Sequence, residues 1–236
     1  MWSESSFVKT ANRPKRKFKS GIEKAVTSFK KGDPILIHDA NDRENEVDLV
    51  FPAKAITPDD VAQMRNDAGG LICVAVSNEV AEAFDLPFLH EIIKHKAGET
   101  KQLAYDDRSS FSLTVNHQDT FTGIVDNDRA LTISKLGDAA ASPSNIDFGA
   151  EFDMPGHVHL LKAAPELLEE RQGHTELGIA LAEYAEIPPA VVVCEMLDDQ
   201  TGGALSRTNA ESYATEHNLV FLDAPAIVEK LGTGSM

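Results

Sequence analysis

GHTELGIALAEYAEIPPAVVVCEM, residues 173–196, carries the clearest structural pattern in the chain. Its first half has the periodicity of an amphipathic helix that places Leu177, Leu181 and Tyr184 on one face. Two consecutive prolines then separate this helix from AVVVCEM (190–196), an apolar run typical of a buried strand. A helix followed directly by a buried strand predicts a layered domain in which helices cover a β-sheet.

Helical and strand patterns continue to alternate on both sides of this stretch. The best-marked further helix has Thr57 as its N-cap and Pro58 at its first position, and it stops at Gly69 and Gly70. Residues 85–125, which include the alternating FSLTVNH, are interpreted as a hairpin and a mobile loop. The other expected helices lie at 21–32 and 208–218, and the other expected strands at 34–39, 48–53, 71–76, 157–161 and 219–223.

We therefore predict an α/β (α+β) fold, a layered single domain over 20–232 with a mixed β-sheet flanked by helices. The basic segment 1–19 is predicted to be a flexible extension, with a targeting or polyanion-binding arm as the alternative. The whole chain has a net charge of −16 although residues 1–31 contain nine Lys and Arg against two acids, so the body is acidic. An acidic body disfavours nucleic acid as a partner, because binding the phosphate backbone needs a positive surface.

Nothing in the sequence predicts a membrane span or a secretory signal. No stretch approaches the roughly 18 apolar residues that a span needs, and the first residues lack an apolar segment. We therefore expect a cytoplasmic protein. In a reducing compartment Cys73 and Cys194, both within apolar runs, are expected to be buried free thiols rather than a disulfide or a zinc site.

The densest polar cluster is HDANDRENEVD (38–48), which lies between two expected strands. Its carboxylates repel one another unless a cation or ordered neighbours compensate them, and Arg43 offsets only one charge. A solvated acidic loop is one explanation, and a site for a hard cation such as Mg²⁺ or Mn²⁺ is the other. An EF-hand is excluded, because Glu44 stands where the calcium loop needs glycine and Val50 where it needs glutamate.

RQGHTE (171–176), at the start of the helix described first, has the components of an anion site. Arg171 offers a planar fork of donors, Gly173 allows close approach of the backbone, and Thr175 adds a hydroxyl beside the helix amides. The helix dipole favours negative charge there, so phosphate is the expected occupant. His174 is either a structural or solvated histidine or, if this segment meets the acidic loop, a cation ligand.

Two further residues are candidates for proton transfer. His157 follows a Pro-Gly turn in MPGHVH (154–159), at the start of an expected strand where general bases are often presented. Glu195 ends the strand AVVVCE, at the end where ligands of open α/β sheets bind, although a solvated strand-end acid has the same pattern. The common nucleotide-binding glycine motifs and the hydrolase G-x-S-x-G motif are absent from the sequence.

Four segments in this order resemble the 3,4-dihydroxy-2-butanone 4-phosphate synthase family of riboflavin biosynthesis: DRENEVD (42–48), MPGHV (154–158), RQGHTE (171–176) and CE (194–195). DRENE followed by GHTE at this separation is a specific combination, and the resemblance extends over residues 20–232. It implies conversion of ribulose 5-phosphate to formate and 3,4-dihydroxy-2-butanone 4-phosphate with Mg²⁺. It also implies a homodimer whose active sites lie near the subunit interface.

The same resemblance implies a role for each matching residue. The metal ligands are Glu44 and His174, with Glu46 nearby to hold metal waters or substrate hydroxyls. The implied substrate contacts are Arg43, Asp48, Arg171, Gly173 and Thr175, of which the last three form the phosphate cradle. His157 and Glu195 match the residues that the family needs for catalysis. These roles agree with enolisation of a ketose, which removes a proton beside a carbonyl group and is assisted by a cation.

Val47 and Met154 depart from the family pattern, which often has glycine and arginine at these positions. Neither change removes a ligand, although Val47 restricts the backbone of the loop. Two rival functions stay open at this point. One is a Mg²⁺-dependent sugar-phosphate isomerase or lyase that stops after enolisation, and the other is a non-catalytic acidic cation-binding scaffold.

Overall fold

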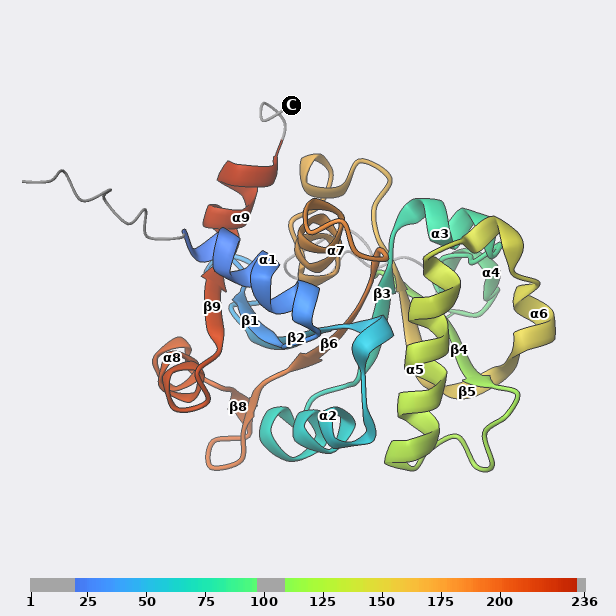
Figure 1. Ribbon diagram of the computed structural model, residues 1–236, viewed down its shortest axis with the longest axis horizontal. Helices are drawn as coiled ribbons and strands as arrows, with labels where there is room; N and C mark the ends of the chain where they lie inside the picture. The colour runs from blue at the N-terminus through green and yellow to red at the C-terminus, as the bar shows by residue number, and fades with distance from the viewer. Residues whose placement is uncertain (1–19, 97–108, 233–236) are drawn as a thin grey trace, which may run out of the picture.

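Figure 1 shows the computed structural model, which describes residues 20–96 and 109–232. The strands of its main sheet are β1 (Ile35–His38), β2 (Val47–Pro52), β3 (Cys73–Val76), β4 (Phe111–His117), β5 (Phe152–Lys162), β6 (Ala190–Glu195) and β9 (Val220–Asp223). They are arranged in the order β4-β5-β3-β6-β2-β1-β9. β3 is parallel to β5 and β1 to β9, while the other neighbours are antiparallel. The predicted mixed sheet is therefore confirmed.

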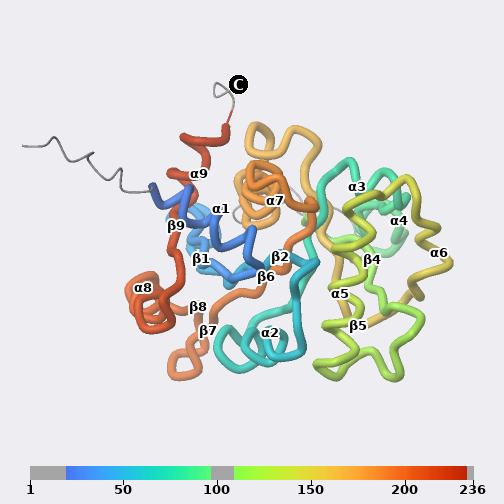
Figure 2. The backbone as a smooth tube through the Cα atoms, viewed as in Figure 1, coloured from blue at the N-terminus to red at the C-terminus, as the bar shows by residue number. Residues whose placement is uncertain are grey.

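Helices cover both faces of the sheet, as predicted. They are α1 (Gly21–Lys31), α2 (Pro58–Gln63), α3 (Asn78–Ala83), α4 (Leu89–Ile92), α5 (Asp126–Ala140), α6 (Phe148–Glu151), α7 (His174–Tyr184), α8 (Arg207–Glu216) and α9 (Ala224–Leu231). One apolar core joins the sheet to α1, α7 and α9, and a second joins its other face to α2, α3, α5 and α8. The first and last helices, α1 and α9, lie side by side (Figure 2). Two short strands, β7 (Leu197–Asp198) and β8 (Gly203–Ala204), pair separately.

The helix boundaries follow the local capping signals. Ser20 caps α1 through a reciprocal capping box, and the helix ends at Gly32, whose φ of 86° suits only a residue without a side chain. Thr57 caps α2 in the same way. The chain then continues through a π-helical turn over Met64–Ala68 and stops at Gly69. The predicted starts and ends of these two helical segments are confirmed.

The hairpin predicted for 85–125 is wrong. β4 forms inside this region, but the strand that it pairs with is β5. Among the described residues of 85–125 no other strand is present, and a short helix, α4, occurs instead. The central part of the predicted mobile loop, 97–108, lies outside the described residues.

The predicted Pro-Gly turn before the strand at 157–161 is also wrong. β5 begins earlier, at Phe152, and the segment 154–157 forms a bulge within it. Val115 pairs with Val158, whereas the next residue of β4, Asn116, pairs with Asp153. The extra residues therefore leave the ladder without ending the strand, because pairing resumes on both sides.

Five helices, α3, α4, α5, α6 and α9, were not predicted from the sequence, and α5 is the longest of them. The inner face of α5 is built largely from small residues, which gives a weak amphipathic pattern. Gly137 explains why: a Cβ there would collide with the backbone of Ala53 and Lys54. A smaller difference concerns α7: of the three residues predicted for its inner face, Leu177 and Leu181 enter the core, but Tyr184 is exposed.

α7 is embedded in the structure, with every residue from His174 to Ala182 buried. Its first residue, His174, lies at the end of the sheet where β1 and β2 are joined and where β6 finishes. Polar residues of the helix start are thus brought beside the acidic segment 38–48. Over the described residues, none of the helices is both long and apolar enough to span a membrane.

Candidate active site

Asp39, the residue directly after β1, organises the acidic loop. One oxygen, Oδ2, accepts from the backbone amide of Glu44 at 3.0 Å and from Arg43 Nη1 at 3.2 Å. The other, Oδ1, accepts from the amide of Glu46 at 3.0 Å. Asp39 is fully buried, so these donors replace the water that its charge would otherwise need. Part of the acidity of the loop is therefore structural.

His38 fixes the same loop from the side of β9. One ring nitrogen, Nε2, lies 3.2 Å from Asn45 Oδ1, and the other, Nδ1, lies 3.1 Å from Asp223 Oδ1. Asn45 has a positive φ of 55°, a conformation that asparagine tolerates better than most residues. The contacts of His38 and Asp39 together hold the short turn that presents Glu44 and Glu46.

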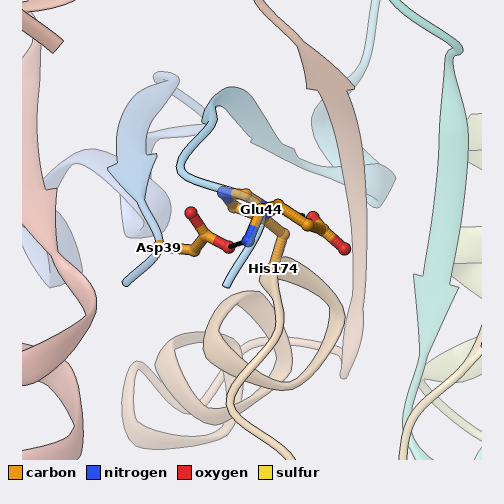
Figure 3. A group of neighbouring side chains, drawn as sticks. All are labelled: Asp39, Glu44 and His174. Atoms are coloured by element: carbon orange, nitrogen blue, oxygen red, sulfur yellow. Dashed lines mark hydrogen bonds and ion pairs between the residues drawn. The ribbon is translucent and has the colours of Figure 1, made fainter. Parts of the chain in front are cut away.

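Glu44, Asp48 and His174 converge at the N-terminus of α7. His174 Nδ1 lies 3.4 Å from Glu44 Oε2, and His174 Nε2 lies 3.6 Å from Asp48 Oδ1. Figure 3 shows Asp39, Glu44 and His174, whose candidate ligand atoms all lie within 4.8 Å of one another. Each oxygen of Asp39 already accepts from a loop amide, and Oδ2 also accepts from Arg43, whereas Glu44 and His174 face each other across the cluster.

Two atoms of this cluster are buried without a hydrogen-bond partner, Asp48 Oδ1 and His174 Nε2. They face each other at 3.6 Å, an ion-pair distance just beyond a hydrogen bond, so each has only a weak partner within the protein. Carboxylate oxygens with one imidazole nitrogen suit Mg²⁺ or Mn²⁺. The residues present therefore fit a hard divalent cation.

The charges of the cluster are strongly coupled. Burial raises the pKa of Asp48, and the nearby charge of Glu195 adds to this rise. Burial opposes the charged form of His174, but the negative charges of Asp48 and Glu44 outweigh it and raise the pKa of His174. Burial and the charge of Glu44 likewise raise the pKa of Glu46. The acids around this one histidine give the cluster an excess of negative charge, which a bound cation would compensate.

Glu44 itself is held in its charged form. Burial opposes ionisation, yet the hydrogen bond to His174 and the charge of Arg43 keep the pKa of Glu44 below its usual value. Arg43 Nη1 lies 3.2 Å from Glu44 Oε1. A carboxylate that stays ionised is the form that binds a metal ion.

Gly173 is the N-cap of α7 and lies between two arginines. A Cβ at this position would stand 2.5 Å from Arg171 Nη1 and 2.7 Å from Arg43 Nη2. Glycine therefore leaves room for both guanidinium groups to approach the helix start. Thr175 is buried in the first turn of the same helix. Two guanidinium groups beside a helix N-terminus form an arrangement suited to a phosphate group.

Glu195 lies directly opposite Asp48 in the pairing of β6 with β2. Its Oε2 accepts from the backbone amide of Leu71 at 2.8 Å. Gly70 makes this contact possible, because a Cβ there would stand 2.5 Å from the same oxygen. The role of Gly70 is missed by sequence reasoning, and the only signal for it is the Gly-Gly pair that was assigned to the helix end.

His157 is the one candidate outside this cluster. It is exposed in the bulge of β5, where its backbone amide donates to Asn116 Oδ1 at 2.8 Å. β3 separates β5 from β6, so His157 and Glu195 belong to strands that are not neighbours in the sheet. The structure thus gathers eight of the nine residues predicted for the site, which are Arg43, Glu44, Asp48, Arg171, Gly173, His174, Thr175 and Glu195.

A mixed sheet with buried acids, a histidine and two arginines at one end defines a class of α/β proteins whose site suits a small anionic ligand together with a cation. Comparison with known proteins narrows this class. The family model for 3,4-dihydroxy-2-butanone 4-phosphate synthase matches residues 23–230. The chain belongs to this family, whose members are enzymes of riboflavin biosynthesis. The resemblance inferred from the motifs is confirmed.

Individual relatives agree with the family model. The chain is 49% identical to the 3,4-dihydroxy-2-butanone 4-phosphate synthase of Archaeoglobus fulgidus, over 88% of this chain and 92% of the relative. The crystal structure of the Candida albicans synthase is 31% identical, with a TM-score of 0.72 over 88% of this chain and 95% of that one. Another synthase structure, in complex with two magnesium ions, has a TM-score of 0.75 at 28% identity, over 90% of this chain and 96% of that one.

Proposed function

We propose that this protein converts ribulose 5-phosphate to 3,4-dihydroxy-2-butanone 4-phosphate and formate with the help of Mg²⁺. The observation that carries the proposal is the convergence of Glu44, Asp48 and His174 on one point, next to the arginines that flank Gly173. A cation ligand set beside a phosphate cradle is what a small phosphorylated ketose requires. Membership of an enzyme family speaks against the scaffold alternative.

The proposed ligands of the cation are Glu44 and His174, with Asp48 and Glu46 close enough to hold its waters or substrate hydroxyls. The unpaired Asp48 Oδ1 and His174 Nε2 support this choice. When bound, Mg²⁺ supplies electrophilic stabilisation of negative charge on substrate oxygens. The complex of a related synthase with two magnesium ions is in keeping with the proposal, and Mn²⁺ would suit the same ligands.

The proposed phosphate site consists of Arg43, Arg171, Gly173 and Thr175. The arginines would bind the phosphoryl oxygens as planar forks, and the amides of the first turn of α7 would add donors. Anchoring the substrate at this end places its carbonyl group toward the acids on β2 and β6. Orientation of this kind lowers the barrier of each later step, because the reacting groups are already in place.

Proton transfers are assigned to Glu195 and His157. The Leu71 amide fixes the carboxylate of Glu195 beside Asp48, where it would take a proton from a carbon next to the carbonyl group. The overall reaction needs no external oxidant, because the carbon lost as formate is oxidised while the remaining four-carbon ketone gains a methyl group. His157, on the far side of β3, would exchange protons with the same substrate from another direction.

We propose a homodimer with the active site near the interface. The loop after β4 supports this: Phe121 is 97% exposed, and Ile124 and Val125 are half exposed. A Cβ on Gly123 in this loop would collide with the side chain of Asn116, which contacts His157. An apolar surface beside a candidate catalytic residue is typical of a subunit contact that contributes to a site.

The decisive experiment follows formate release. Incubation of the protein with ¹³C-labelled ribulose 5-phosphate and Mg²⁺ should give labelled formate in the NMR spectrum. Isomerised ketose without formate would favour the rival isomerase or lyase.

We propose that residues 20–232 form the catalytic domain, so removal of residues 1–19 should leave turnover intact. Sedimentation at micromolar concentration tests the dimer, and a monomer with full activity would contradict it.

A further inference from the structure

We infer that Glu176 is a positioning residue that holds the guanidinium group of Arg171 toward the phosphate end of the substrate. The inference rests on the proposed function, because it presumes that Arg171 binds phosphate. Glu176 occupies the third position of α7, and its side chain is fully buried. It is therefore shielded from substrate and acts through Arg171.

Both oxygens of Glu176 are engaged. Oε2 accepts from Arg171 Nη1 at 2.8 Å, and Oε1 accepts from the backbone amide of Ala164 at 3.1 Å. Ala164 follows β5, whereas Arg171 precedes α7. One buried carboxylate thus ties the end of a strand and the segment before the helix to the helix itself. The position of the arginine is thereby set by two separate parts of the fold.

The neighbourhood of Arg171 explains why such a holder is needed. Arg171 Nη1 and Arg43 Nη2 approach the same point above Gly173, and two like charges so close repel each other. Each arginine has its own buried carboxylate, Asp39 for Arg43 at 3.2 Å and Glu176 for Arg171 at 2.8 Å. These carboxylates offset the repulsion from the side away from solvent. They let the two cations stay together before any phosphate is bound.

Glutamine is an informative replacement because it has nearly the same shape as glutamate. Its side chain has one acceptor oxygen and one amino group, whereas Glu176 accepts from two donors. Whichever way the glutamine amide turned, its amino group would face either Arg171 or the backbone amide of Ala164. Glu176→Gln should therefore release Arg171 or strain the strand end without opening a cavity.

The test measures binding of inorganic phosphate by calorimetry and the steady-state kinetics of the full-length protein. Glu176→Gln should weaken phosphate binding and raise KM about tenfold, with KM rising more than kcat falls. Glu183→Gln, on the exposed part of the same helix, is the matched control and should leave both values within about twofold. Thermal melting of each variant shows whether it is folded.

A second comparison separates positioning from general stability and from the proposed function. In an Arg171→Ala background, the added Glu176→Gln change should cause no further loss of phosphate affinity. If Arg171→Ala leaves phosphate affinity unchanged, the proposed phosphate site is wrong. If Arg171→Ala weakens binding while folded Glu176→Gln does not, only the positioning role is overturned. A further loss of affinity in the double variant would also contradict that role.

Discussion

Gly173→Ala tests the arginine pair directly, because it adds one carbon atom and removes no polar group. The new Cβ would stand 2.5 Å from Arg171 Nη1 and 2.7 Å from Arg43 Nη2, where ordinary contacts begin at 3.4 Å. Each guanidinium group must retreat by about 1 Å, a displacement that can cost roughly 100-fold in rate when it misplaces substrate. We expect kcat/KM to fall about 10- to 100-fold, mostly through KM.

The fold should tolerate the change. Gly173 has φ −87° and ψ 169°, which alanine adopts without strain. Alanine is a poorer N-cap than glycine, but its more restricted unfolded chain offsets this, so stability should change by less than about 1 kcal/mol. That corresponds to a shift in Tm of no more than about 2–4 °C for a chain of this size.

The assay is formate release at varied ribulose 5-phosphate, together with thermal melting. Gly149→Ala is the matched control, since the nearest atom to its new Cβ is Asp147 Oδ1 at an ordinary 3.8 Å. An unaltered KM in folded Gly173→Ala would refute the reasoning, because both arginines would then have moved without consequence. A loss of folding would leave KM untested, so phosphate affinity of the Arg43→Lys variant provides the second measurement of the same pair.

Three further changes address the remaining parts of the site. Glu44→Gln or His174→Ala should abolish turnover and weaken Mg²⁺ binding measured by calorimetry. The thermal melting curve of each variant should stay cooperative. Activity close to that of the original protein would refute the ligand assignment. Arg171→Lys should raise KM by roughly tenfold through loss of the planar fork, measured in the formate assay, and an equal KM would count against the phosphate role. Asp39→Asn should lower the free energy of unfolding in urea by about 1–3 kcal/mol, because its amino group would face either the Glu46 amide or both the Glu44 amide and Arg43. Unchanged stability would mean that the loop is held by other contacts.

Features encoded within a few residues could be predicted from the sequence. The capping box at Thr57, the stop at Gly69 and the burial of Leu177 and Leu181 all depend on neighbours in the chain, so their patterns are visible in it. The pairing of β4 with β5 depends on contacts between distant segments, and the alternation of β4 fits a local hairpin equally well. The small inner face of α5 was missed because the residue that it packs against, Lys54, belongs to another part of the chain.

In the candidate site, too, some residues could be predicted from the sequence, whereas the roles of others depend on contacts that only the structure shows. Glu44 was identified only because it matches a family pattern, and His174 because it matches that pattern and is a histidine beside an expected anion site. Asp39 looks like any other acid of 38–48. Only the structure shows that the Asp39 carboxylate faces inward to the loop amides, while Glu44 faces His174.

The acids at this end of the sheet therefore have opposite requirements. Asp39 and Glu176 are fully buried, and each of their oxygens accepts at least one hydrogen bond from the protein. Asp48 is just as buried but keeps an unpaired oxygen 3.6 Å from His174. The fold thus satisfies the acids that shape the site and leaves unsatisfied the one beside the candidate cation position. Burying a carboxylate in this state costs stability, and a bound cation would recover that cost.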